Sequence, residues 1–230
     1  MERPRQLVLD LPARPALARE DFFVSPANAL ALAQVDRWPD WPSGRLALAG
    51  PEGAGKTHLV HVWAAARGSA RVMPASALAA LDVGAVESGE AVAVEDMDRL
   101  PDVGRKAAEE ALFHLCNRLA GGGGSLLVSG REAPARWAIA LPDLASRLRA
   151  APVARLEAPD DALLAAVLVK LFADRQLVVG PDLVQFLLTR IDRSFAAATE
   201  TVAALDRAGL ARHRPITARL AGDVLRGAAS

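Results

Sequence analysis

The stretch Gly50-Pro51-Glu52-Gly53-Ala54-Gly55-Lys56-Thr57 has the spacing G-x-x-x-x-G-K-T and decides how the rest of the chain is interpreted. Apolar residues 46–49 predict a short buried strand before it, and residues 57–67 predict a helix after it. Glycines here let backbone N–H groups turn inward around an anion, and the helix N-terminus adds partial positive charge. Lys56 can then reach the β- and γ-phosphates of a nucleotide, and the Thr57 hydroxyl can ligate Mg²⁺. The spacing therefore predicts a site for a nucleoside di- or triphosphate, with a chance glycine-rich turn as the alternative.

The composition limits the class of protein. The chain has 230 residues, enough for one large or two small domains, and 52% of them are hydrophobic. The apolar runs are too short for a membrane span, and no signal-peptide segment follows the first residues. The single cysteine, Cys116, excludes an internal disulfide and is interpreted as a core residue, so we expect a cytoplasmic protein. The formal net charge is zero, so we expect no dedicated DNA-binding domain, although an arginine-rich stretch over 207–219 leaves a nucleic-acid contact open.

Short apolar runs alternate with helical segments in the first two thirds of the chain. This alternation predicts a parallel five-stranded sheet, flanked by helices on both faces, with strands at 46–49, 70–73, 91–94, 125–129 and 153–156. A helix is expected over 105–119, with the glycine run 121–124 as a connection. Beyond residue 158 only helices are predicted, over 160–174, 181–191, 194–208 and 215–227. We therefore expect an extended arm over 1–20, an α/β nucleotide-binding domain over 21–157 and a small all-α lid domain over 158–230.

Two acids, Glu95 and Asp96, follow the apolar run 91–94 directly. The carboxyl end of a buried parallel strand lies beside the phosphate loop, which makes this pair a Walker B arrangement. We expect Glu95, together with Thr57, to hold the Mg²⁺ and Asp96 to polarise an attacking water. A solvated strand end is the alternative. Asp98 is expected to cap or solvate the turn that follows.

Three further residues are candidates for the same chemistry. Ser129 and Arg131 end another apolar strand at the same edge of the sheet and can sense a γ-phosphate, with ordinary turn residues as the alternative. Arg147 lies in the segment 141–148, shortly before the domain junction. An arginine there can project into a neighbouring subunit's nucleotide site and stabilise charge on the transferred phosphoryl group. On the residue pattern alone, a surface salt bridge is the simpler interpretation of Arg147.

Several stretches together resemble the AAA+ superfamily, and within it the branch of the replication initiator DnaA and its shorter relatives, the Hda family. Residues 55–59, Gly-Lys-Thr-His-Leu, are similar to the G-K-T-H-L start of that branch, and residues 21–28 are similar to the opening of its AAA+ domain. Residues 141–148 resemble the Hda segment L-P-D-L-A-S-R-L. The resemblance implies that ADP or ATP, with Mg²⁺, is bound by Gly50, Pro51, Gly53, Ala54, Gly55, Lys56, Thr57 and His58.

The N-terminal residues Gln6-Leu7-Val8-Leu9-Asp10-Leu11 are similar to the sliding-clamp-binding peptide of Hda proteins. In such an arm Leu9 and Leu11 enter an apolar groove while Gln6 hydrogen-bonds at its rim, and Leu7 belongs to the same peptide. Taken alone, the alternating leucines favour an unpaired arm or strand. With the DnaA-like core, the clamp interpretation becomes the better one.

The resemblance implies a regulator of replication initiation. Such a protein holds ADP, binds the sliding clamp and promotes hydrolysis of DnaA-bound ATP in trans through its arginine finger, here Arg147; a homodimer is left open. Three departures weaken the case that this chain hydrolyses its own ATP: the lid arginine of the family falls at Ala196, Glu95 takes the metal position, and Arg131 replaces an acid. The alternative is a self-hydrolysing AAA+ ATPase, acting as a helicase- or clamp-loading factor or as a DnaA-like DNA-remodelling protein.

Overall fold

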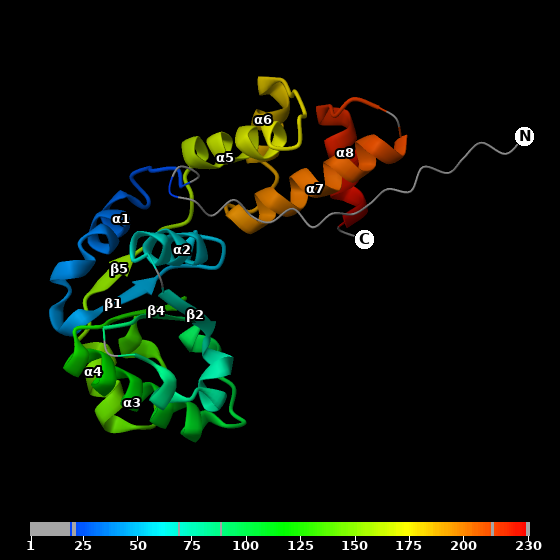
Figure 1. Cartoon of the computed structure of the whole chain (residues 1–230). Helices are drawn as coiled ribbons and strands as arrows, with labels where there is room; N and C mark the ends of the chain where they lie inside the picture. Colours follow the sequence, from blue (N-terminus) through cyan, green and yellow to red (C-terminus); the bar gives the residue numbers. More distant parts are fainter. Residues whose placement is uncertain (1–18, 20–21, 69, 88, 213, 229–230) are drawn as a thin grey trace, which may run out of the picture.

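The structure, a computed structural model, describes residue 19 and residues 22–68, 70–87, 89–212 and 214–228. The peptide expected to bind a clamp, residues 6–11, lies outside the described residues. The described chain forms an α/β part followed by a helical part, drawn from yellow to red in Figure 1.

Five parallel strands make the sheet, which confirms the sequence prediction. Their order across the sheet is β2-β3-β4-β1-β5. All four neighbouring pairs are parallel, so the carboxyl ends of the strands share one edge. The bounds are β1 Arg45–Ala49, β2 Ala70–Pro74, β3 Ala91–Glu95, β4 Ser125–Gly130 and β5 Val153–Arg155.

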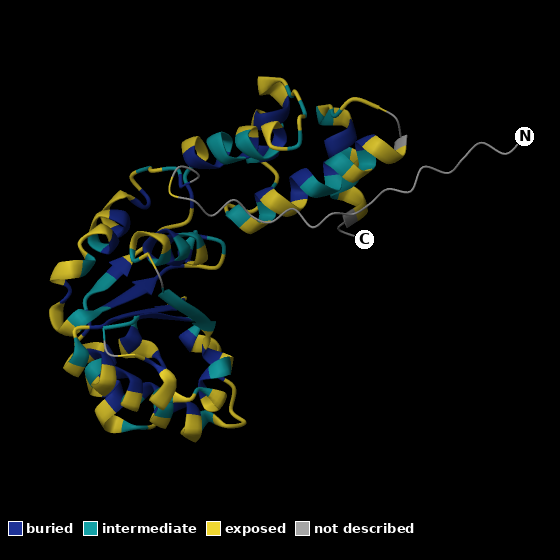
Figure 2. Cartoon of the chain, in the orientation of Figure 1, coloured by how far each residue is buried: buried dark blue, intermediate teal, exposed yellow. Residues whose placement is uncertain are grey.

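Helices cover both faces of this sheet (Figure 1). On one face lie α1 (Ala29–Asp36) and α2 (Lys56–Ala66), whose buried cluster includes the stacked rings of Trp41 and Trp63. On the other face lie α3 (Arg105–Gly122) and α4 (Pro142–Arg149) around a second cluster. The central strands are therefore buried on both sides, as their dark blue colour in Figure 2 shows, which explains why they are apolar throughout rather than alternating.

Short 3₁₀ segments complete the α/β part. They are η2 Trp38–Asp40, η3 Pro42–Gly44, η4 Ala75–Ala80, η5 Val83–Ala85, η6 Met97–Arg99 and η7 Pro134–Arg136.

Helix α3 is longer than the sequence predicts, because the first two residues of the glycine run, 121 and 122, continue it. Gly123 then ends the helix with φ of +72°, and both its N–H and that of Gly124 donate to the carbonyl of Leu119. Only a glycine adopts this left-handed conformation without strain, so the end of α3 falls at the third glycine and not before the first.

The C-terminal residues form the helices α5 (Asp161–Ala173), α6 (Pro181–Leu188), α7 (Phe195–Arg212) and α8 (Ala218–Ala228). The Asp160 carboxylate accepts a hydrogen bond from the N–H of Leu163 at 2.7 Å and so caps α5. These helices enclose a cluster of their own, in which Leu168, Phe172 and Leu205 are fully buried. Among the described residues of this part no strand occurs. No helix in the described chain is both long and apolar enough to cross a bilayer.

Candidate functional site

The phosphate loop joins β1 to α2 at the carboxyl edge of the sheet. Gly53 and Gly55 have φ of +72° and +93°, and Gly55 is the N-cap residue of α2. Within the described part of the chain, the N–H groups of Gly55, Lys56 and Thr57 have no hydrogen-bond acceptor. Three N–H groups at one helix N-terminus form a cradle for an anion, so the loop fits the polyphosphate that its sequence predicts.

Lys56 is 8% exposed and lies against its own loop. Its Nζ donates hydrogen bonds to the carbonyls of Gly50 and Pro51, at 2.8 and 2.9 Å. Burial lowers the pKa of Lys56 below its ordinary value of 10.5, while the carboxylates of Asp96 and Asp98 act in the opposite direction. The ammonium group of Lys56 therefore lies at the loop, hydrogen-bonded to two neutral carbonyls. A charged phosphate forms stronger hydrogen bonds to an ammonium group than a neutral carbonyl does, so it can replace them.

Both loop glycines are packed against the start of α7. A Cβ atom on Gly53 would lie 2.4 Å from Ser194 Cβ, and one on Gly55 would lie 2.9 Å from the Phe195 ring. The N–H of Phe195 donates to the carbonyl of Gly53 at 3.0 Å. The helical part therefore touches the phosphate loop directly, and these two positions exclude any side chain on steric as well as conformational grounds.

Glu95 and Asp96 lie at the carboxyl end of β3, where the sequence predicts them. Glu95 is the last residue of β3 and is half-buried. Asp96 has φ of +57°, and its N–H donates to the hydroxyl of buried Ser129 at 3.3 Å, which ties the ends of β3 and β4 together. Thr57 is exposed in the first turn of α2, and no hydrogen bond joins it to Glu95.

The described residues hold no cluster of three or more His, Cys, Asp or Glu side chains able to bind a metal ion.

The Asp98 carboxylate caps no N–H group of the turn that follows it, so the expectation of a cap is wrong. Its Oδ1 accepts a hydrogen bond from the N–H of Arg131 at 3.0 Å, and its Oδ2 lies 3.8 Å from Arg131 Nε. The reason is the sheet: β3 and β4 are neighbours, so residues 33 positions apart meet just beyond the strand ends.

Arg147 lies in the last turn of α4, on the face of the sheet covered by α3. Its guanidinium carbon is 4.7 Å from the ring centroid of Phe113. No carboxylate among the described residues pairs with it, so the surface salt bridge that its pattern favours does not form. Among the described residues, no hydrogen bond or ion pair joins Arg147 to the phosphate loop.

The resemblance to AAA+ proteins predicts that the lid arginine falls at Ala196, which lies at the start of α7. Ala196 is the second residue of α7 and is exposed, so it offers no charge to a phosphate. Arg193 pairs with Asp161 at 2.9 Å. It is thus engaged within the helical part.

Glu109 is a residue that the sequence analysis missed. It is 2% exposed, and its carboxylate accepts hydrogen bonds from the N–H groups of Ala140 and Leu141, the latter at 2.8 Å. It thereby anchors the chain immediately before α4, the helix that carries Arg147. Helical periodicity could have found it, because Glu109 precedes the buried residues Leu112 and Cys116 by three and seven positions.

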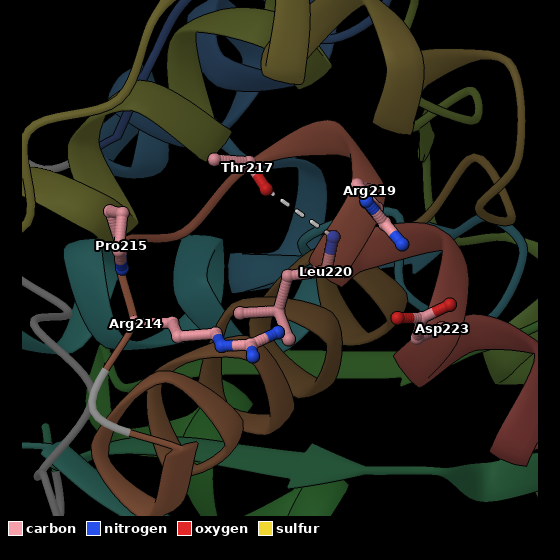
Figure 3. Close-up of a pocket in the computed structure, with 6 residues that line it drawn as sticks. All are labelled: Arg214, Pro215, Thr217, Arg219, Leu220 and Asp223. Atoms are coloured by element: carbon pink, nitrogen blue, oxygen red, sulfur yellow. Dashed lines mark hydrogen bonds between the residues drawn. The ribbon is translucent and has the colours of Figure 1, made fainter.

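A shallow pocket of about 140 Å³ lies at the connection between α7 and α8, apart from the strand ends (Figure 3). Its lining residues are Arg214, Pro215, Thr217, Arg219, Leu220 and Asp223. Thr217 Oγ1 accepts a hydrogen bond from the N–H of Leu220 at 3.4 Å, drawn as a dashed line, and so caps α8. The arginine-rich stretch is therefore partly a helix connection, and a nucleic-acid contact there stays a prediction.

The five-stranded parallel sheet and its flanking helices match the fold of DnaA and RuvB structures. The chain is similar to domain III of the replication initiation protein DnaA from Thermotoga maritima, with a TM-score of 0.76 at 19% identity, over 94% of this chain and 98% of that domain. It is also similar to AMPPCP-bound DnaA from Aquifex aeolicus, with a TM-score of 0.65 at 19% identity, over 87% of this chain and 69% of the other.

A third similar structure is the RuvB Holliday junction branch migration motor of Thermotoga maritima, with a TM-score of 0.63 at 15% identity, over 80% of this chain and 61% of the other. No protein-family model matches the chain. At these identities the likeness establishes the fold alone.

Proposed function

We propose that this protein is an Hda-like regulator of replication initiation that binds a nucleotide, attaches to the sliding clamp and stimulates hydrolysis of DnaA-bound ATP. The nucleotide is ADP or ATP with Mg²⁺, and the clamp peptide is residues 6–11. The arginine finger is Arg147, which acts in trans on the nucleotide of DnaA. The observation that carries the proposal is that Arg147 contacts an aromatic ring and pairs with no carboxylate among the described residues.

Arg147 is a charged side chain without a charged partner in the described chain. Its guanidinium rests on an aromatic ring, and the helix that carries it is anchored by buried Glu109. A cation–π contact with a half-exposed ring is weak, on the order of 0.5–1 kcal/mol, so the guanidinium can leave it for a phosphate. An anchored helix with a releasable arginine, which has no hydrogen bond or ion pair to its own phosphate loop, supports action on another molecule's nucleotide.

The chain's own site supports binding more than hydrolysis. Lys56 and the N–H groups of residues 55–57 would hold the phosphates, and Thr57 and Glu95 would share the Mg²⁺, which supplies charge neutralisation when bound. The helical part would act as a lid, since Phe195 already contacts Gly53. Ala196 brings no positive charge to this lid, which removes a stabilising contact to the γ-phosphate.

The test is hydrolysis of DnaA-bound ATP with DNA-loaded clamp, in the presence and absence of this chain. We expect strong stimulation by the wild type and its loss in Arg147→Ala, because an arginine finger contributes roughly 10³–10⁵ in rate. Arg149→Ala is the matched control, an exposed arginine two residues further along the same helix. Full stimulation by Arg147→Ala, or equal loss in both variants, would refute the assignment.

The clamp attachment is tested separately. Changing both Gln6 and Leu7 to Ala should abolish retention of the protein on immobilised clamp while leaving nucleotide binding unchanged. Retention of the double variant would assign the N-terminal arm to another role.

A second candidate, a self-hydrolysing AAA+ ATPase, is favoured by one observation: Asp96 is joined to Ser129 at the strand edge and influences Lys56 electrostatically. The Asp96 backbone is thus fixed at the strand edge, which supports its carboxylate as the group that polarises a water. ATP turnover by the purified protein alone, lost in Asp96→Asn, would support this candidate over the first.

A further inference from the structure

Glu52 lies in the outer part of the phosphate loop and is held by two arginines. Its Oε2 accepts a hydrogen bond from Arg99 Nη2 at 3.1 Å and another from Arg131 Nη2. All three side chains are open to solvent, with 65% of Glu52, 52% of Arg99 and 47% of Arg131 exposed. This cluster can therefore exchange its partners with an ion from solution.

The two arginines come from the ends of neighbouring strands. Arg99 closes η6, which follows β3, and Arg131 directly follows β4. Asp98 holds Arg131 by its backbone N–H and lies near its guanidinium. Both arginines thus reach the phosphate loop from the carboxyl edge of the sheet, on the strands that also supply Asp96 and Ser129.

Glu52 and Arg131 both interact electrostatically with Lys56 of the phosphate loop. Both influence the ammonium group of Lys56, Glu52 by favouring its charged form and Arg131 by disfavouring it. A third phosphate on a nucleotide held by this loop adds negative charge at this edge, where the guanidinium groups already have a carboxylate as partner.

We propose that Glu52 is a specificity-determining residue, an anion built into the loop that competes with the terminal phosphate of a nucleoside triphosphate for Arg99 and Arg131. The inference rests on the proposed nucleotide binding. A triphosphate has to displace the Glu52 carboxylate from the arginines and is repelled by it. A diphosphate held by Lys56 and the loop N–H groups leaves the cluster intact. The carboxylate therefore shifts the preference of the site toward the diphosphate.

The experiment measures Kd for MgADP and for Mg²⁺ with the triphosphate analogue AMPPCP by titration calorimetry. An exposed ion pair contributes up to about fivefold to an equilibrium constant. We therefore expect Glu52→Gln to tighten AMPPCP binding about fivefold and ADP binding less than about twofold. Arg131→Ala should weaken AMPPCP binding more than ADP binding, because it removes a guanidinium that the terminal phosphate needs.

The matched control is Asp102→Asn, which removes an exposed carboxylate paired with Arg105 at 2.8 Å and no contact to the cluster. Equal tightening of both nucleotides in Glu52→Gln, the same shift in Asp102→Asn, or a shift of undiminished size when Arg99 and Arg131 are both Ala would overturn the inference alone. A wild type that binds neither nucleotide would overturn the proposed function as well. Unfolding temperatures of all variants confirm that each is folded.

Discussion

Replacing Glu109 by Gln tests whether the buried carboxylate under α4 stabilises the fold and presents Arg147. The change keeps the size of the side chain but exchanges one accepting oxygen for an NH₂ group. The N–H of Ala140 lies 3.1 and 3.0 Å from the two carboxylate oxygens, and that of Leu141 lies 2.8 Å from one of them. A glutamine oxygen at the Oε2 position can still accept from both N–H groups, but the NH₂ group then replaces Oε1 and its hydrogens face the N–H of Ala140.

The magnitude follows from the charge that the two hydrogen bonds lose. A bond to a charged group contributes about 1.5–3 kcal/mol and a neutral one about 0.5–1.5 kcal/mol, so the two bonds together lose about 2–3 kcal/mol. The lower cost of burying a neutral amide offsets part of this. We expect a net loss near 2 kcal/mol, which for a chain of this size lowers Tm by roughly 4–8 °C.

The assay is thermal unfolding combined with hydrogen exchange of the peptide that contains residues 140 and 141. Glu110→Gln is the control, since its carboxylate is on the next position of α3, half exposed and 3.9 Å from Lys106 Nζ. It should cost only about 0.5 kcal/mol. Under the proposed function, faster exchange at 140 and 141 should accompany weaker stimulation of ATP hydrolysis by DnaA. Equal unfolding temperatures for the two variants, with unchanged hydrogen exchange, would show that the hydrogen bonds of Glu109 contribute nothing to the free energy of unfolding.

Three further outcomes follow from the structure. Gly53→Ala should lower the unfolding temperature more than Gly68→Ala, because both positions have positive φ but only Gly53 would clash with Ser194; equal shifts would disprove the packing of loop and α7. Nucleotide affinity should fall as the pH rises through the pKa of Lys56, which lies below 10.5, because the ammonium group that binds the phosphates loses its proton. Calorimetry in alkaline buffer should therefore detect proton uptake on nucleotide binding. An affinity that does not change with pH would contradict this expectation. Cys116 is 1% exposed and burial raises its pKa, so iodoacetamide should label it only after unfolding; labelling of the native protein would be the contrary result.

Local sequence patterns predicted the strands, the phosphate loop and the parallel arrangement of the strands. This succeeded because fully buried parallel strands are continuous apolar runs and because the loop is a contiguous motif. The end of α3 was missed, since a glycine run does not show which glycine takes the left-handed conformation. Asp98 was assigned to its own turn, because a short polar residue before a turn usually serves that turn.

The sequence by itself determined the α/β class, the glycine-rich loop at residues 50–57 and the acids at the carboxyl end of β3. Each of these depends on residues close together in the chain. Only the tertiary structure decided the partners of the charged side chains: Arg131 with Glu52 and Asp98, Arg147 with Phe113, and Glu109 with the turn before α4. These contacts join residues that strand order and helix packing bring together from more than thirty positions apart, and charge partners at that separation leave no periodic trace in a single sequence.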